Sequence, residues 1–118
     1  MTDKPKRVLC ALEDIPDGNS KGFPPVPGAF TGLFAVRRGR QVWVYVNSCP
    51  HIGVPLDPVP DRFLDTKKQN ILCSTHGARF RVEDGFCTSG PCYGEYLEAV
   101  RAHVNEHDQV MVPEDAGL

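Results

Sequence analysis

The chain has 118 residues, with 13 Lys and Arg, 15 Asp and Glu, 11 Gly, 11 Pro and five Cys, and its formal net charge at pH 7 is −2. This length suits one domain and leaves no room for a second catalytic domain, and the slightly negative charge argues against nucleic acid or an anionic membrane as the main partner. No run of 18 apolar residues exists and no apolar segment follows the first basic residues, so we expect neither a membrane span nor a secretory signal, and a cytoplasmic protein.

Glycine and proline divide the chain into short segments, a pattern that favours strands and loops over helices. Residues 1–6 and 114–118 are expected to be flexible tails around one domain at 7–113. Residues 22–28 contain three prolines and are expected to form an extended loop, because proline cannot donate a hydrogen bond to a strand ladder. The segments with strand-like patterns are, in chain order, 8–12, 33–37, 42–46, 71–72, 79–82, 86–87, 96–104 and 109–112. These features predict an all-β domain of antiparallel strands.

The clearest hairpin joins the second and third of these segments through a turn that contains Gly39. In its second strand Trp43 and Tyr45 share one face, and the valines beside them share the other. The last two segments predict another hairpin. Two longer loops, at 47–60 and 73–78, interrupt the middle of the chain.

These two loops hold the residues with metal-binding chemistry. The first contains Cys49 and His51 and the second Cys73 and His76, in the pattern C-x-H, 21 intervening residues, C-x-x-H. A mononuclear zinc site commonly takes like ligands from each arm of the chain, whereas each loop here supplies one Cys and one His. A 2Fe–2S centre with two Cys on one iron and two His on the other explains why each loop supplies one Cys and one His. A mononuclear zinc site is the alternative.

The residues around these ligands resemble the two cluster-binding boxes of Rieske ferredoxins. The first box is 49–57, CPHIGVPLD, and the second is 73–80, CSTHGARF. The likeness extends over roughly residues 8–112 and includes Gly-Pro at 90–91, which matches the proline loop that covers the cluster in this family. It implies a Rieske-like iron–sulfur fold with a small cluster-binding subdomain at about 47–92.

The resemblance also implies roles for individual residues. Cys49 and Cys73 would hold the buried iron. His51 and His76 would hold the outer iron. Other residues would lie beside the cluster or on a docking surface: Ile52, Gly53, Val54, Pro55, Gly77, Ala78, Phe80 and Pro91. The apolar docking patch for a redox partner would be formed by Ile52, Val54, Pro55, Ala78 and Pro91.

Two departures from the respiratory branch of the family predict a low reduction potential. Val54 and Thr75 stand where that branch has an extra disulfide-bonded cysteine in each box. Ala78 and Phe80 stand where it has a Ser and a Tyr that donate hydrogen bonds to cluster sulfurs. With fewer donors the reduced cluster is less stabilised, so we expect a potential at the low end of the Rieske range.

Three further features fall outside this pattern. Residues 58–70 make the gap between the boxes long, and they predict an added turn or hairpin that either lengthens a loop or serves docking. Cys10 is expected to be a small buried hydrophobe. Cys87 and Cys92 flank residues 88–91, and the sequence leaves open whether they pair under oxidation. We expect free thiols, because a cytoplasmic compartment keeps thiols reduced.

The resemblance implies an electron carrier rather than an enzyme. One electron would come from a flavin-containing reductase and pass to a Rieske non-haem iron oxygenase. The alternatives are a small Rieske-type subunit of an NADH-dependent nitrite reductase or other redox complex, and a structural zinc module. An oxygenase in its own right is excluded, because neither the spare histidines nor the length provides a 2-His-1-carboxylate iron site in a pocket.

Overall fold

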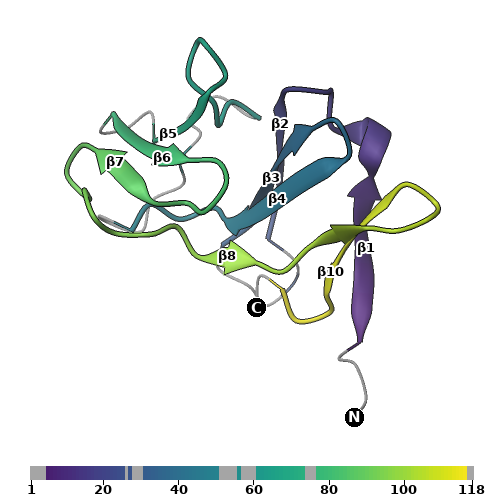
Figure 1. The fold of residues 1–118 in the computed structure, drawn as a ribbon. Helices are drawn as coiled ribbons and strands as arrows, with labels where there is room; N and C mark the ends of the chain where they lie inside the picture. The colour runs from purple at the N-terminus through teal and green to yellow at the C-terminus, as the bar shows by residue number, and fades with distance from the viewer. Residues whose placement is uncertain are drawn as a thin grey trace.

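The computed structural model describes residues 5–25, 27, 31–50, 56, 61–73 and 77–116. Within these residues the chain forms ten strands and one short 3₁₀ turn (Figure 1). In chain order they are β1 (Lys6–Ala11), the 3₁₀ turn η1 (Leu12–Asp14), β2 (Ser20–Phe23), β3 (Leu33–Arg38), β4 (Gln41–Val46), β5 (Asn70–Cys73), β6 (Ala78–Arg81), β7 (Cys87–Ser89), β8 (Ala99–Val100), β9 (His103–Val104) and β10 (Gln109–Pro113). The all-β prediction is confirmed for the part of the chain that the structure describes.

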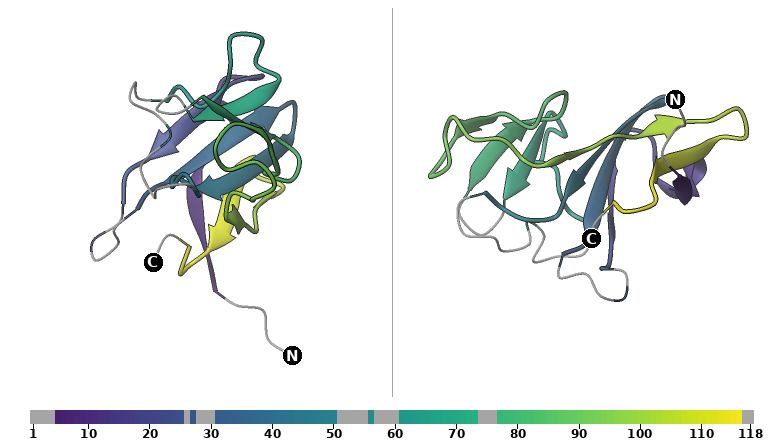
Figure 2. Two further views of the ribbon diagram at one scale, coloured as in Figure 1. Left: turned by 90° about the vertical axis from the view of Figure 1, so that its left-hand side faces the viewer. Right: turned by 90° about the horizontal axis from the view of Figure 1, so that it is seen from below.

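The strands form three antiparallel sheets, in the orders β1–β10–β9, β2–β3–β4–β8 and β5–β6–β7. Figure 1 shows the four-stranded sheet in the middle of the molecule, with β5–β6–β7 on one side and β1 and β10 on the other. The right-hand view of Figure 2 shows the same separation, so the sheet β5–β6–β7 forms one end of the molecule. Within the described residues, no helix has the length and apolar character needed to cross a membrane.

The hairpin β3–β4 lies at the centre because both of its faces are buried. Tyr45 belongs to the core that also contains residues of β5, β6 and β7, and Trp43 packs against that core. Val44 and Val46 belong to a second core, shared with β10 and flanked by β1. Alternate residues of a strand point to opposite faces, so one strand contributes to two cores. The alternation predicted for this strand is confirmed.

Strand β2 differs from the predicted loop at 22–28. It pairs with β3 over its whole length, from Ser20 to Phe23. The prolines that disfavoured a strand begin at Pro24, after the last paired residue, so they end the strand and do not prevent it. The backbone N–H of Gly22 also donates to the Asp61 carboxylate at 2.8 Å, which fixes this edge strand to a distant part of the chain.

The C-terminal part of the chain also departs from the sequence prediction. The predicted strand 96–104 is divided between two sheets: β8 pairs with β4, whereas β9 pairs with β10 in the expected last hairpin. A flexible tail is expected from residue 114, yet Ala116 is buried in the second core. Its carbonyl accepts a hydrogen bond from the Arg7 guanidinium at 2.9 Å, a long-range contact that local sequence does not signal.

Residues 61–70 form part of the core and do more than lengthen a loop. The Phe63 ring is fully buried and stacks on Phe34, with ring centroids 4.4 Å apart and an interplanar angle of 3°. Leu64 forms a β-bridge with Ile71 in β5, and the Leu72 N–H donates to the Phe63 carbonyl at 2.8 Å. This segment therefore supports β5, the strand that ends at Cys73.

Asp65 holds the turn of this segment together. Its carboxylate accepts hydrogen bonds from the Gln69 N–H at 3.0 Å and from the Asn70 side chain at 3.1 Å, and the Arg79 guanidinium lies 3.7 Å away. Burial alone would raise the pKa of the Asp65 carboxyl, but the hydrogen bonds from Asn70 and Gln69, together with the charge of Arg79, lower it below its ordinary value of 3.8. The folded chain thus favours the charged form of this side chain.

We expect Asp65→Ala to lower the free energy of unfolding at pH 7 by about 1–3 kcal/mol, because the Gln69 N–H, the Asn70 N–H and the Asn70 side chain lose their acceptor. A carboxyl with a lowered folded-state pKa contributes stability that is present above its unfolded pKa and is lost as pH falls through the folded pKa. The difference in the free energy of unfolding between wild type and variant, measured by denaturant unfolding, should therefore decrease below about pH 4. Asp115→Ala, at an exposed position near the C-terminus, is the control. An unchanged difference down to pH 2 would contradict this account.

Candidate metal centre

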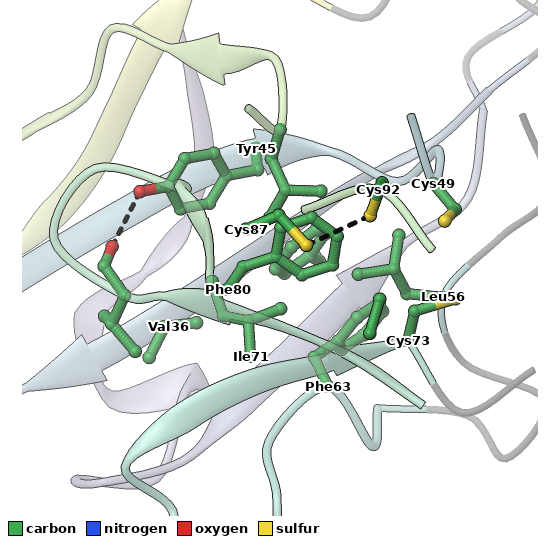
Figure 3. Packing of buried hydrophobic residues seen from close by; sticks show 14 residues of the cluster. Val36, Tyr45, Cys49, Leu56, Phe63, Ile71, Cys73, Phe80, Cys87 and Cys92 are labelled. Carbon is green, nitrogen blue, oxygen red and sulfur yellow. Dashed lines mark hydrogen bonds between the residues drawn. The ribbon is translucent and has the colours of Figure 1, made fainter. Parts of the chain in front are cut away.

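The structure brings the two predicted cysteine ligands into one buried site. Cys73 is the last residue of β5, and Cys49 follows the end of β4. Both side chains are fully buried and belong to the same core. Figure 3 shows them at one end of this core, on the side away from Tyr45. The other two predicted ligands, His51 and His76, lie outside the described residues, as do Ile52, Gly53, Val54 and Pro55.

Each of the two predicted loops is closed at its base by a hydrogen bond. The Leu56 N–H donates to the Asn47 side-chain oxygen at 2.9 Å, which joins the two ends of the first loop. The Gly77 N–H donates to the Cys73 carbonyl at 2.8 Å, which closes the second. Gly77 adopts a left-handed φ of +72°, a conformation that glycine accepts without steric cost. Asn47 lies outside the ligand pattern, although an Asn at the end of a strand is a common loop-closing residue and signals this role in the sequence.

The described surroundings of the two thiols are apolar. Leu56, Ala78 and Phe80 are fully buried in the same core, and none of these side chains carries a hydrogen-bond donor. Ala78 is the cross-strand partner of Cys73 in the β5–β6 ladder. Two thiols in a site that excludes water are suitable ligands for iron, so the described half of the site fits a metal centre.

Burial corrects one of the predicted docking residues. Ala78 is fully buried, so it cannot contact a partner protein as part of an apolar docking patch. Its position at the start of β6 instead makes it a packing residue beside Cys73. Pro91 is exposed, as a docking residue must be.

The loop that contains Pro91 packs directly on Ala78. A Cβ atom added to Gly90 would lie 2.7 Å from the Ala78 Cα, closer than real Cβ atoms approach, and Gly90 has a φ of +102°. Only glycine therefore allows residues 90–91 to approach β6 this closely. The approach places this loop against β6, the strand that contains the last residues of the second ligand box.

Cys92 is a buried cysteine that the ligand pattern does not use. Burial, a hydrogen bond with Cys87 and the negative charges of Cys87 and Cys49 raise the pKa of its thiol to about 12. Cys92 belongs to the same core as the predicted ligand Cys49, and Figure 3 shows the two side chains at the same end of it. The Cys92 thiol therefore stays protonated at neutral pH and is a poor metal ligand.

A model of the Rieske [2Fe-2S] domain family matches residues 6–110 of the chain. The chain belongs to this family. The cofactor of the Rieske domain is a [2Fe-2S] cluster, so the zinc alternative is excluded. Which residues of this chain ligate the cluster remains the prediction given above, supported by the shared burial of Cys49 and Cys73.

Solved structures resemble this Rieske chain over nearly its whole length. A chain from the complex of reduced oxygenase and oxidized ferredoxin in carbazole 1,9a-dioxygenase is 27% identical with a TM-score of 0.73, and the match covers 98% of this chain and 99% of that chain. The ferredoxin of carbazole 1,9a-dioxygenase from Nocardioides aromaticivorans IC177 is 25% identical with a TM-score of 0.72, over 92% and 96% of the two chains. No curated protein sequence matches the chain.

A third similarity concerns the fold alone. A chain from a carbazole-bound oxygenase and ferredoxin complex is 19% identical with a TM-score of 0.74. The match covers 93% of this chain but only 28% of that longer chain. The same sheet arrangement thus also occurs as one part of a larger protein.

Proposed function

We propose that this Rieske chain is a ferredoxin that accepts one electron from a flavin-containing reductase and passes it to a Rieske oxygenase. The observation that carries this proposal is the similarity to the carbazole dioxygenase ferredoxin, which extends over 92% of this chain and 96% of the other. A protein of this kind transfers electrons and has no substrate site of its own. The cytoplasmic location expected from the sequence is part of the proposal.

We further propose that Cys49 and Cys73 hold the buried iron and that His51 and His76 hold the outer one. The cluster supplies one-electron oxidation and reduction when bound. The protein contributes an apolar wall beside the thiolates, with Leu56, Ala78 and Phe80 excluding water. Because Ala78 and Phe80 carry no donors, we expect a potential on the order of −150 mV, near the low end of the Rieske range.

Ala78→Ser tests this account of the potential. Ala78 is the cross-strand partner of Cys73, so a hydroxyl there is placed to donate toward the sulfur atoms and to stabilise the reduced state. A hydrogen bond of about 1 kcal/mol corresponds to an increase of about 40 mV for one electron. Protein-film voltammetry measures the change. Ala99→Ser, at an exposed position on β8, is the control, and equal potentials for both variants would mean that residue 78 does not influence the cluster.

Pro91→Glu tests the docking face. Pro91 is exposed on the loop that packs on Ala78, so a charge there should oppose close approach of an oxygenase, and we expect electron transfer to slow about tenfold. The matched control is Val8→Glu, which adds the same charge at a 46% exposed valine on β1, on the opposite side of Figure 1 from β7. Stopped-flow transfer rates and visible spectra are measured for both.

The same experiment separates the proposal from its alternative. Slow transfer in Pro91→Glu with an unchanged spectrum supports docking at this face. Equal rates in both variants would place the docking surface elsewhere. Co-purification of the wild-type chain in a stable complex with a reductase would favour the alternative, a permanent subunit such as that of an NADH-dependent nitrite reductase.

A further inference from the structure

Cys87 and Cys92 form a buried pair of thiols beside the candidate cluster site. Their Sγ atoms are 3.2 Å apart, with the Cys92 thiol donating to the Cys87 sulfur (Figure 3). The Cys87 thiol in turn donates to the Ser89 carbonyl at 3.2 Å. The exposed fractions are 0% for Cys87 and 2% for Cys92. The two sulfur atoms are therefore held in contact by packing and by a short chain of hydrogen bonds.

The backbone on either side of the pair is fixed. The Gly94 N–H donates to the Cys87 carbonyl at 3.1 Å, and the Cys87 N–H donates to the Glu95 carbonyl at 2.8 Å. The Tyr93 N–H donates to the Gly90 carbonyl at 3.2 Å, which fixes the turn that contains Cys92. A disulfide requires the sulfur atoms to approach to about 2.05 Å, a movement of about 1.2 Å that side-chain rotation can supply.

The loop between the two cysteines is also the loop that packs beside the candidate ligands. Gly90 rests on Ala78, the cross-strand partner of Cys73, and Cys92 belongs to the same core as Cys49 (Figure 3). A covalent bond between Cys87 and Cys92 would close a ring around residues 88–91 and hold Gly90 in place. Oxidation of this pair would thus restrain the loop that packs beside the candidate cluster site.

We propose that Cys87 and Cys92 are a dithiol–disulfide modification site that is oxidised by a peroxide. The Cys92 sulfur attacks one peroxide oxygen, the O–O bond breaks, and a sulfenic acid and one water form. The Cys87 sulfur then displaces the hydroxyl group from the Cys92 sulfur, so that the S–S bond forms and a second water leaves with the remaining thiol proton. Two thiols and one hydrogen peroxide give one disulfide and two waters, and two electrons pass from sulfur to peroxide.

Burial keeps the pair reduced under ordinary conditions. Cys87 is fully buried and only 2% of the Cys92 surface is exposed, so peroxide reaches the two sulfur atoms slowly. Oxidation is therefore slow and responds to sustained exposure to peroxide. An added dithiol such as dithiothreitol reverses it by thiol–disulfide exchange.

The test uses the cluster-loaded protein exposed to increasing hydrogen peroxide, then catalase, denaturation with N-ethylmaleimide and trypsin digestion. Cleavage after Arg81 and Arg101 gives the peptide 82–101, which contains both cysteines and no others, whereas Cys10 lies in the peptide 8–21. We expect peptide 82–101 to become unalkylated and lighter by two hydrogens while the visible absorbance of the cluster is retained. Dithiothreitol should restore both alkylation sites.

Variants make the result specific to this pair. Cys92→Ala should abolish the mass change and leave Cys87 alkylated, and Cys87→Ala should do the same for Cys92. Cys10→Ser, which changes a half-buried cysteine on β1, should leave disulfide formation unaltered.

Three outcomes would overturn the proposal: full alkylation of peptide 82–101 after peroxide, a disulfide from Cys92 to Cys49 or Cys73, or loss of the cluster before the disulfide forms. The readout requires no redox partner. A negative result for the disulfide therefore does not contradict the proposed electron transfer. A negative result for electron transfer does not contradict the proposed disulfide.

Discussion

Cys49→Ser and Cys73→Ser are each expected to abolish the [2Fe-2S] cluster. Both thiols are fully buried in one core, so water cannot replace either of them as a ligand when it is removed. A serine hydroxyl is a far weaker ligand for iron, because it is not deprotonated at neutral pH and lacks the soft character of sulfur. Iron content should fall from two atoms per chain to nearly none, and the visible absorbance should disappear.

Iron analysis and visible spectra of the purified variants measure this effect. Two controls distinguish ligation from the general cost of changing a buried cysteine. Cys92→Ala alters a buried cysteine near Cys49 that is not a predicted ligand, and Cys10→Ser alters a half-buried one in another sheet. Both should retain the cluster. Full iron content in either ligand variant would refute the ligand assignment.

Gly90→Ala is expected to lower the free energy of unfolding by about 2–5 kcal/mol. The added methyl group would lie 2.7 Å from the Ala78 Cα, and at a φ of +102° an alanine is strained even in open space. Strain at such a φ costs about 1–2 kcal/mol, and overpacking of a buried contact adds about 1–3 kcal/mol. The loop 90–91 must move away from β6 to relieve the contact.

Gly94→Ala is the matched control for this prediction. Gly94 has a similar φ of +89°, but nothing lies within 4 Å of an added Cβ, so only the backbone strain of about 1–2 kcal/mol applies. Denaturant unfolding of both variants measures the difference, and the visible spectrum reports any change at the cluster. Equal losses of stability would mean that the approach of Gly90 to Ala78 contributes nothing.

The central hairpin could be predicted because its signal is local. Residues 42–46 alternate between two faces within five positions, and the turn glycine lies next to them. Strand β2 was missed because its pairing with β3 and its contact with Asp61 depend on residues far away in the sequence. The segment 96–104 was read as one strand for a similar reason, since its two halves carry the same pattern but join different sheets.

The Rieske family and the candidate ligand boxes follow from local sequence, because ligand type and spacing within each box are properties of a few consecutive residues. The environment of these boxes depends on contacts between distant segments. That Phe63 stacks on Phe34 and that Gly90 rests on Ala78 follows from how separate segments pack. The contact between the Cys87 and Cys92 sulfur atoms follows from the conformation of the loop that joins them. Such contacts depend on the position of the whole backbone, which no short stretch of sequence specifies.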